Sequence, residues 1–442
     1  MYRTLSEQEQ RDSIIANIET ADRPTSLGVA IFGGGFSFGM EEAGFEIAGH
    51  LEYPDLALGV RSSRARWPVA VTDVNGMTSF VKWLRDEGVV PDALHANPPC
   101  VAFAGTGSHK GVDDDRMCYL RWCFYNVGMA LAPKMVAWEL VPAIWTRSRN
   151  WLESMAFKAR LMGYRSYAFM TTSAAHGGFQ NRKRFHFIAS KVKLPFDEVW
   201  DAEPEGRKGW RTLGDALKIV DDARLVQMEA RPDEIEEAEK VYTRESSESL
   251  LGFLPNDHNV YNGCFNAIFP FVPPGSHVRD LPDSVMHEHY RPNGNAWTGK
   301  GLPGFGHTRG RMDRPSPNIM GGHTVVHPVE DRYITPREAA TVMGFPLDYE
   351  FSRGSTAYAE IGKGLCTHNA AFLGRVMRAG LEADEGVEPM PVGGETMIEF
   401  HDFRKRGPKV PKLIMSYEEQ VQWWRESYPL MDVPEGFGRK RA

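Results

Sequence analysis

The feature that most constrains the fold is a short apolar run that leads directly into glycines. Residues 27–32 read LGVAIF, and GGGFSFG and then MEEAGFEIAG follow at once. An apolar run, a glycine turn and an amphipathic segment in this order predict a strand, a tight turn and a helix. The regular part of the chain therefore begins as a strand–helix–strand unit.

The same alternation continues over the next hundred residues. Further apolar runs read AGHLEYP, WPVAVTDV, ALHAN and KMVAWELV, and a helix-like stretch from Arg116 to Ala130 precedes the last of them. Strands that alternate with helices predict an α/β doubly wound fold, in which helices cover both faces of a parallel sheet. Ligands of such sheets bind at the carboxyl ends of the strands. The residues that end each run are therefore the candidates for a site.

Polar residues end the second and third runs. Glu52 ends one run and is followed by Tyr53, and Asp73 ends the next. A glycine turn lets the backbone approach a nucleotide-like ligand. A carboxylate can accept from ribose hydroxyls, an aromatic ring can stack on a base, and a second carboxylate can accept from an adenine amino group. Each carboxylate alone is commonly a solvated strand end, but together they favour an adenosine-containing ligand.

The fourth run ends in NPPC, residues 97–100, and glycines follow. A lone cysteine is more often a small buried apolar residue than a reactive one. Here the rigid entry through Pro98 and Pro99 and the glycine-rich exit favour an exposed, aimed side chain. Cys100 is therefore a candidate thiolate nucleophile, provided that its pKa is lowered.

Two further segments carry charged residues toward this site. Glu139 stands in VAWELVP, where apolar neighbours should raise its pKa, as suits a proton donor or a partner of a ring nitrogen. In GGFQNRKRFHFIAS, Arg182 and Arg184 lie on one side of an expected strand, with Lys183 on the other. An isolated R-x-R is usually solvated, but one that leads into a buried strand more plausibly points at a ligand.

The chain changes in character after FHFIASKVKLP. Residues 197–250 are highly charged and helix-prone, whereas residues 255–328 are rich in Gly, Pro, His, Asn and Arg. The regular pattern resumes with TPREAATVMGF, in which Thr335 and Glu338 predict a capping box. We expect a catalytic domain in two parts, residues 28–190 and 327–383, with a loop-rich domain, residues 191–326, between them. An N-terminal extension, residues 1–27, and a C-terminal extension, residues 384–442, complete the chain.

Composition excludes some classes of protein. The formal net charge of −7 argues against a protein that coats nucleic acid nonspecifically, although it allows a local basic cleft. The five cysteines show no paired CxxC spacing, so neither a zinc site nor a disulfide framework is expected. The sequence has neither a membrane-spanning run nor a signal peptide. We expect a cytoplasmic monomer without a metal.

These segments, taken in order, resemble the DNA cytosine-5 methyltransferase family over about residues 28–373. FGGGFSFGMEEAGF is similar to the family's cofactor motif, NPPC to its Pro-Cys motif, WELV to its Glu-Asn-Val motif and QNRKR to its Gln-x-Arg-x-Arg motif. RPSPNI, RYITPREAATVMGFP and IGKGLCTHNA resemble the later segments. Each motif alone is weak support, but the ordered set is highly specific.

The resemblance implies a Rossmann-like class I methyltransferase sheet with a smaller target-recognition domain. It implies S-adenosyl-L-methionine as the cofactor and double-stranded DNA with a flipped cytosine as the substrate. Cys100 would add to C6, Glu139 would protonate N3, and Arg184 with Arg182 would bind O2. The DNA-reading surface would include WTGKGLPGFGHTRGRMDR, residues 297–314. The implied cofactor contacts are Phe32, Gly34, Gly35, Glu52, Tyr53, Asp73, Pro98 and Lys363.

The sequence departs from the family pattern in three places. The glycine motif is shorter by about two residues, Leu140 replaces an asparagine, and Lys363 stands where the last motif has an asparagine. A lysine near a sulfonium is repelled, but it would pair with the carboxylate of carboxy-S-adenosyl-L-methionine. The alternatives are therefore a carboxymethyltransferase that makes 5-carboxymethylcytosine, or a Lys363 that faces solvent, Glu360 or a DNA phosphate in an ordinary methyltransferase.

Two other classes of function compete with these. A catalytically silent homologue would bind DNA without transferring a group, but the complete set of Cys100, Glu139, Arg182 and Arg184 argues against it. An RNA-directed enzyme is conceivable, although no residue singles out RNA. The resemblance is compatible with restriction–modification or with phage DNA modification, and the target sequence cannot be inferred.

Overall fold

The computed structural model describes residues 5–56, 58–104, 107, 110–230, 254–258, 263–299, 307–322, 324–388, 396–410, 415–429, 431–435 and 437. The chain divides into two compact units, and segments of the two alternate along the sequence. Unit 1 comprises Met1–Gly177, Arg182–Gly209 and Lys363–Pro408. Unit 2 comprises Gly178–Asn181, Trp210–Gly362 and Lys409–Ala442. The functional names given to the domains expected from the sequence remain predictions.

Unit 1 is built on an eight-stranded sheet in the order β10-β6-β7-β5-β4-β1-β2-β3. The first five strands along the chain pair in parallel, whereas β7 runs antiparallel to both β5 and β6, and β10 lies parallel to β6. This arrangement confirms the expected Rossmann-like α/β fold. The strands are β1 (Thr25–Val29), β2 (Glu46–Glu52), β3 (Val69–Val71), β4 (Ala93–Ala96), β5 (Met135–Leu140), β6 (Arg165–Thr172), β7 (Lys183–Ser190) and β10 (Ile398–Asp402).

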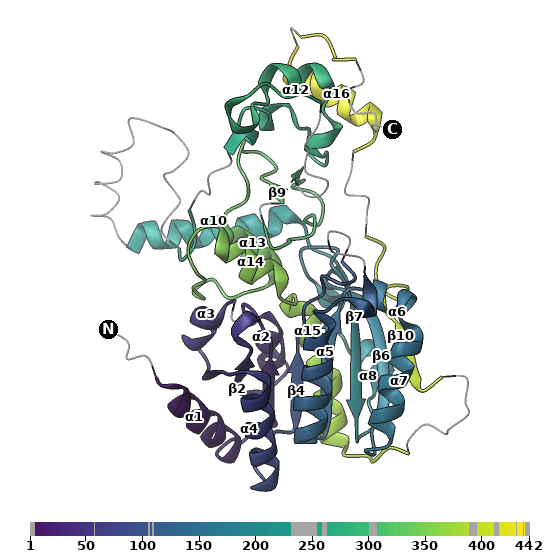
Figure 1. Ribbon diagram of the computed structural model, residues 1–442. Helices are drawn as coiled ribbons and strands as arrows, with labels where there is room; N and C mark the ends of the chain where they lie inside the picture. Colours follow the sequence, from purple (N-terminus) through teal and green to yellow (C-terminus); the bar gives the residue numbers. More distant parts are fainter. Residues whose placement is uncertain are drawn as a thin grey trace. The chain divides into compact units, whose positions relative to one another are not determined.

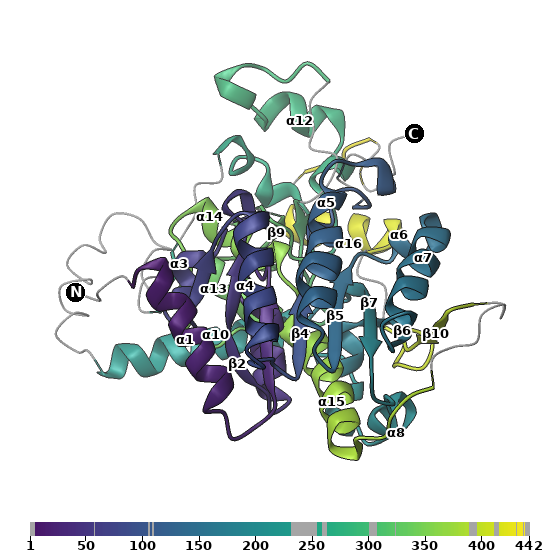
Figure 2. The same cartoon turned by 60° about the horizontal axis from the view of Figure 1, so that its bottom comes forward.

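Helices cover both faces of this sheet (Figure 1; Figure 2). On one face lie α4 (Val74–Asp86), α5 (Met117–Arg121) and α7 (Arg149–Arg160), and on the other lie α2 (Gly35–Glu42), α8 (Phe196–Asp201) and α15 (Thr367–Ala383). The axes of α2 and α15 approach closely because Gly39 has no side chain, and a Cβ there would lie 2.3 Å from that of Ala370. The remaining helices of unit 1 are α1 (Glu7–Glu19), α3 (Val60–Arg64), α6 (Ala143–Arg147) and α9 (Glu205–Lys208).

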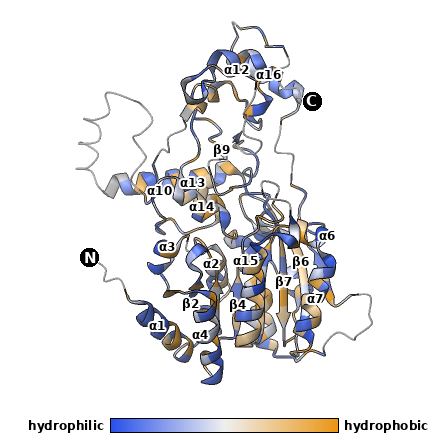
Figure 3. Ribbon diagram, viewed as in Figure 1, coloured by the Kyte–Doolittle hydropathy of each residue, from blue (hydrophilic) through white to orange (hydrophobic). Residues whose placement is uncertain are grey.

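The central strands are buried on both faces. Every residue of β1 and of β5 is buried, as expected for parallel strands between two helix layers. Figure 3 shows β6 and β7 mostly in the orange of hydrophobic residues. The apolar runs read from the sequence therefore form one continuous core.

Two elements end or wind differently from the sequence expectation. The first strand stops at Val29 instead of continuing to Phe32, because Ala30 and Phe32 take positive φ angles of 55° and 56° that a strand cannot contain. The stretch expected to be one helix from Arg116 to Ala130 is α5 followed by a π-helix, Trp122–Met129. Extra residues in a π-turn often mark functional positions.

Unit 2 is rich in loops. Its described helices are α10 (Leu213–Ala230), α12 (Asp283–His289), α13 (Pro336–Met343), α14 (Ser355–Lys363) and α16 (Tyr417–Ser427). Its short strands are β8 (Thr308–Arg309) and β9 (Val325–Val326). The last residue of α14, Lys363, belongs to unit 1. The apolar core around Ile268, Phe269 and Met286 includes Trp424 of α16. Residues 231–253 of the charged stretch and 300–306 of the expected DNA-reading surface lie outside the described residues.

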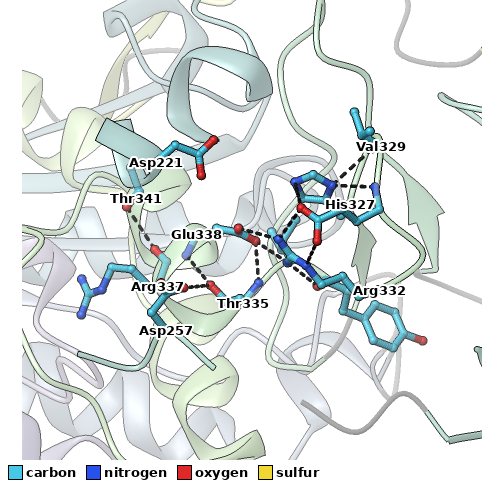
Figure 4. Close-up of polar contacts among 12 residues, drawn as sticks. Asp221, Asp257, His327, Val329, Arg332, Thr335, Arg337, Glu338 and Thr341 are labelled. Atoms are coloured by element: carbon cyan, nitrogen blue, oxygen red, sulfur yellow. Dashed lines mark hydrogen bonds and ion pairs between the residues drawn. The ribbon is translucent and has the colours of Figure 1, made fainter. Parts of the chain in front are cut away.

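Helix α13 begins with the predicted capping box. Thr335 Oγ1 accepts from Glu338 N at 3.1 Å, and Glu338 accepts from Thr335 N at 2.7 Å. Figure 4 shows the same carboxylate facing Arg332, and both guanidinium nitrogens of that residue bond to it at 2.8 and 2.9 Å. Arg224 of α10 adds a bond of 2.9 Å to Glu338 and two of 2.7 Å to Asp257. A buried ion cluster therefore joins α10 to α13.

The C-terminal segment contributes to the cores of both units. Ile398 of β10 belongs to the main apolar core of unit 1, and Trp424 of α16 is fully buried in unit 2. Among the described residues, no helix has the length and apolar character needed to cross a bilayer. The part of the chain that the structure places also contains no group of three His, Cys, Asp or Glu side chains suited to a metal.

Candidate active site

The candidate catalytic residues meet at one edge of the sheet of unit 1. Cys100 follows β4 in the Pro-Pro loop, and Glu139 lies near the carboxyl end of β5. Strand β7 runs antiparallel to β5, with Glu139 opposite His186, so that Arg184 at the start of β7 reaches the same edge. The topology thus brings together residues more than 80 positions apart in the sequence.

The buried side chains of Glu139 and Arg184 lie in contact. Arg184 Nε lies 3.1 Å from Glu139 Oε2, and the two side chains are 11% and 3% exposed. Burial raises the pKa of Glu139, while Arg184 and Arg182 oppose that rise. The raised pKa matches the expectation from the apolar neighbours in VAWELVP and suits a carboxyl group that must carry a proton.

Cys100 is partly buried against the apolar core. Burial raises the pKa of its thiol, Arg184 is the main group that lowers it, and Glu139 raises it further. The free site therefore holds a neutral thiol at pH 7, which differs from the lowered pKa that the nucleophile reading required. The positive charge that would favour a thiolate is nevertheless present in Arg184 and Arg182.

Arg182 is held by the segment that follows α14. Its Nη2 donates to the carbonyl oxygen of Gly364 at 3.0 Å, and its backbone N–H donates to Ser173 Oγ at 3.4 Å. The side chain is buried, and burial lowers its pKa. The IGKGLCTHNA motif is thus in direct contact with one of the two candidate arginines.

Asn97 is a site residue that sequence reasoning missed. With its amide oriented to satisfy both neighbours, Nδ2 donates to Glu139 Oε1 at 2.6 Å, and Oδ1 accepts from Leu365 N at 3.1 Å. The side chain is 1% exposed. The only signal in the sequence was its place directly before Pro98, in a motif interpreted for its prolines and its cysteine.

Glu52 offers an unpaired oxygen at the end of β2. Its Oε1 accepts from Ile31 N at 2.6 Å, whereas Oε2 is buried without a hydrogen-bond partner among the described residues. Burial raises the pKa of Glu52 to about 8, against the effect of the Ile31 N–H. A buried orphan acceptor is costly unless a ligand pairs with it. The site therefore fits a ligand with hydroxyl donors, as in the ribose of S-adenosyl-L-methionine.

The side chain of Tyr53 is buried under other aromatic rings, whereas stacking on a base would need an open ring face. It is 2% exposed, and its ring centroid lies 5.6 Å from that of Tyr119 and 5.5 Å from that of Trp122. The α5 and π-helix segment therefore covers this ring in the structure. A stacking role for Tyr53 remains a prediction and would require Tyr119 or Trp122 to move.

The glycine turn is supported by a segment that the sequence did not point to. Gly34, with φ of 88°, caps α2, and Gly35 is the first residue of that helix. The carbonyl oxygen of Phe32 accepts from Ser63 Oγ at 3.3 Å, and a Cβ on Gly59 would lie only 2.2 Å from the same oxygen. Residues of α3 and the turn before it thus brace the shortened loop.

The other candidate cofactor residues are placed as follows. Asp73 is exposed and caps α4, since its Oδ1 accepts from Gly76 N at 2.7 Å. This use of the carboxylate leaves its second oxygen for the predicted adenine contact. Pro98 is buried, and Lys363 is exposed at the end of α14. Leu140, which takes the place of the family asparagine, is fully buried in the core.

Comparisons with known proteins show the family of the chain. The family model for C-5 cytosine-specific DNA methylases matches residues 32–378. The chain is 24% identical over 352 residues to the type II methyltransferase M.Sau96I of Staphylococcus aureus, an alignment that covers 77% of this chain and 73% of that one. It is 25% identical over 354 residues to the type II methyltransferase M.Eco47II of Escherichia coli, covering 77% and 76%.

A solved structure shares the fold. The structure of a putative DNA modification methyltransferase encoded within an E. coli prophage superposes with a TM-score of 0.52 at 19% identity, covering 81% of this chain and 99% of the other.

Proposed function

Because the chain belongs to the family of C-5 cytosine-specific DNA methylases, we propose that it transfers a methyl group from S-adenosyl-L-methionine to C5 of a cytosine flipped out of double-stranded DNA. The observation that carries this proposal is the cluster of a thiol, a carboxyl group with a raised pKa and two arginines at one edge of the sheet. Extrusion of the base is required because the stack hides C5 and C6, and it costs a few kcal/mol.

Cys100 and Glu139 have complementary tasks in this reaction. Cys100 gives up its thiol proton to solvent as its sulfur forms a bond to C6, and the electron pair of the C5–C6 double bond moves toward C5 and N3. Glu139 gives its proton to N3, which neutralises the charge that develops on the ring. Arg184 holds O2 with help from Arg182. Once C5 has formed its bond to the transferred methyl group, the C5 proton leaves to solvent, the sulfur–C6 bond breaks, and the N3 proton returns to Glu139.

Residues at the ends of β1, β2 and β3 would hold the cofactor. The turn at Phe32, Gly34 and Gly35 would approach its backbone, and Glu52 would accept from the ribose through its unpaired Oε2. When bound, S-adenosyl-L-methionine supplies an electrophilic methyl group. The neutral thiol of the free site implies that base binding, which engages Glu139 and Arg184, also adjusts the charge seen by Cys100.

Trapping with 5-fluorocytosine DNA tests this function. The fluorine cannot leave as a proton does, so a methylating enzyme stays covalently bound through Cys100. We expect a denaturation-resistant adduct with the unmodified chain and none with Cys100→Ala. Cys118→Ala is the matched control, since Cys118 is also partly exposed but lies on α5. Absence of an adduct from every protein would favour the catalytically silent DNA-binding homologue instead.

A second candidate concerns the donor and rests on Lys363. Its side chain is exposed, and two residues further on the backbone N–H of Leu365 bonds to Asn97, next to Pro98 and the cysteine loop. An ammonium group at this place would attract a carboxylate on the transferring carbon, as in carboxy-S-adenosyl-L-methionine. The product would then be 5-carboxymethylcytosine.

The donor is identified by the mass of nucleosides from DNA treated with an equal mixture of both donors. A methyl product assigns ordinary methylation, and a carboxymethyl product assigns the second candidate. In the latter case Lys363→Asn should restore preference for S-adenosyl-L-methionine. The control Lys82→Asn, an exposed lysine on α4, should leave the product ratio unchanged.

A further inference from the structure

The two oxygens of the Glu139 carboxyl group have different surroundings. Oε1 accepts from Asn97 Nδ2 at 2.6 Å, whereas Oε2 lies 3.1 Å from Arg184 Nε without an aligned hydrogen bond among the described residues. One oxygen is therefore fully engaged by an uncharged donor. The other has Arg184 close by but no aligned hydrogen bond, so it can take a further partner.

The orientation of the Asn97 amide is fixed from its other end. The Leu365 N–H points at Asn97 Oδ1 across 3.1 Å, so the amide carbonyl must face Leu365. Rotating the amide by 180° would set its NH₂ group against that N–H and an oxygen against the carboxylate. A backbone donor cannot reverse its role. In the opposite orientation Nδ2 would reach only the carbonyl oxygen of Lys363, at 3.5 Å. We therefore place the amide hydrogens of Asn97 at Oε1.

A proton on Oε1 would point at those hydrogens across 2.6 Å, so Oε1 is kept as an acceptor. We propose that Asn97 is a positioning residue that directs the carboxyl proton of Glu139 to Oε2, the oxygen that donates it to N3 of the cytosine. The inference rests on the proposed function. In the reaction the proton leaves Oε2 for N3 while the sulfur–C6 bond forms, and it returns to Oε2 when the sulfur is eliminated.

The groups around Glu139 are compatible with this assignment. Arg184 and Arg182 favour its ionised form, burial favours its protonated form, and the Cys100 thiol is neutral in the free site. His186, its register partner on β7, is buried with a pKa well below the usual range and so carries no charge. Of the groups named here, neither the arginines nor His186 bonds to Oε1, so Asn97 is its hydrogen-bond donor.

Leu140 cannot take the place of Asn97 as a donor. The residue directly after Glu139 on β5 is apolar and fully buried, so it offers no side-chain donor to the carboxyl group or to the cysteine loop. Asn97 instead reaches Glu139 from the loop after β4 and links it to the segment after α14. One amide thus ties two other segments of unit 1, the loop after β4 and the segment after α14, to the proton donor on β5.

A double-mutant comparison tests the proposal. We would measure adduct formation with 5-fluorocytosine DNA in single turnover for Asn97→Ala, in the native protein and in a Glu139→Gln background. With Glu139 present, the Asn97 bond stabilises the carboxylate that forms as the proton leaves, so its loss should slow the reaction roughly ten- to a hundredfold. In the Glu139→Gln background there is no carboxyl proton to direct, so Asn97→Ala should change the rate by less than about threefold. Equal losses in both backgrounds would overturn the proposal.

A pH profile gives a second reading that packing alone would not move. Asn97→Asp keeps the shape of the side chain and the acceptor for the Leu365 N–H, but it sets a carboxylate against Glu139. This negative charge raises the pKa of Glu139, so the pH above which activity is lost should rise by about one unit. Asn17→Asp is the matched control. The amide of Asn17 also donates a hydrogen bond to a residue distant in the sequence, since its Nδ2 lies 3.0 Å from the carbonyl oxygen of Ala48. An unmoved profile in folded Asn97→Asp and Asn97→Ala would contradict the proposal.

The outcomes also separate this inference from the proposed function. No adduct with the unmodified protein would overturn the proposed function, and the inference with it. An adduct whose formation ignores Asn97 would overturn the inference alone. Thermal unfolding of each variant shows whether a loss of rate is a loss of fold.

Discussion

Removing the charge of Glu338 should destabilise unit 2 strongly. This carboxylate is fully buried and receives bonds from Arg332, Arg224 and the backbone of Thr335. These contacts lower its pKa from 4.5 to about 2 despite its burial. A difference of that size between folded and unfolded states corresponds to roughly 3 kcal/mol at pH 7. Loss of one partner of a buried pair typically costs about 3–5 kcal/mol, so we expect Glu338→Gln to cost about 3–4 kcal/mol.

The sign of the pH dependence follows from the direction of the shift. Because the folded-state pKa is lowered, the stabilisation is complete above about pH 4.5 and is lost as the pH falls toward 2. Glu338→Gln should therefore be less stable than the native protein at pH 7, and the difference should shrink in acid. Urea unfolding followed by tryptophan fluorescence, with hydrogen exchange of α13 amides, measures both effects.

Glu419→Gln is the matched control. Glu419 holds the same position in the capping box of α16, but its side chain is 52% exposed. An exposed carboxylate is screened by water, so its replacement should change stability little. The reasoning would be refuted if Glu338→Gln cost no more than Glu419→Gln, or if its destabilisation were the same at pH 7 and pH 3.

Two predictions concern the expected cofactor site. Glu52→Gln should weaken S-adenosyl-L-methionine binding about tenfold, because the amide replaces one hydrogen-bond acceptor. Since a ribose contact favours the ionised carboxyl, native affinity should rise with pH through about 8, and calorimetry should find no such rise in the variant. Gly59→Ala should lower both the melting temperature and cofactor affinity, because a Cβ would meet Phe32 O at 2.2 Å and φ is +86°. Gly88→Ala, with φ of +77° but open space around it, controls for backbone strain alone, and equal effects would contradict the clash argument.

The parallel part of the sheet could be predicted because apolar runs and glycine turns are local signals. Each run from LGVAIF to KMVAWELV overlaps a strand of the structure, and the capping box at Thr335 formed as its spacing indicated. The residues at which strands and helices end were harder to predict. The positive φ angles at Ala30 and Phe32 depend on the turn that follows, and no property of alanine or phenylalanine signals them.

The site was predictable to the extent that its chemistry depends on residue type. Cys100, Glu139, Arg182 and Arg184 carry groups whose reactivity is recognisable in any context. Asn97 is different, because an amide gains a role only from its neighbours in space, and those neighbours come from β5 and from the segment after α14. The raised pKa of Cys100 likewise depends on burial by long-range packing.

The alternation of the two units along the chain has a consequence for biosynthesis. Unit 1 receives its edge strand only at Ile398–Asp402, and unit 2 receives the buried Trp424 later still. Domains usually complete their folding in order as they leave the ribosome. Here unit 1 still lacks an edge strand when most of unit 2 has been synthesised, so the two must mature together. A premature stop codon before Ile398 would therefore leave both units incomplete, and no single cut of the gene would yield two fragments that each encode one entire unit.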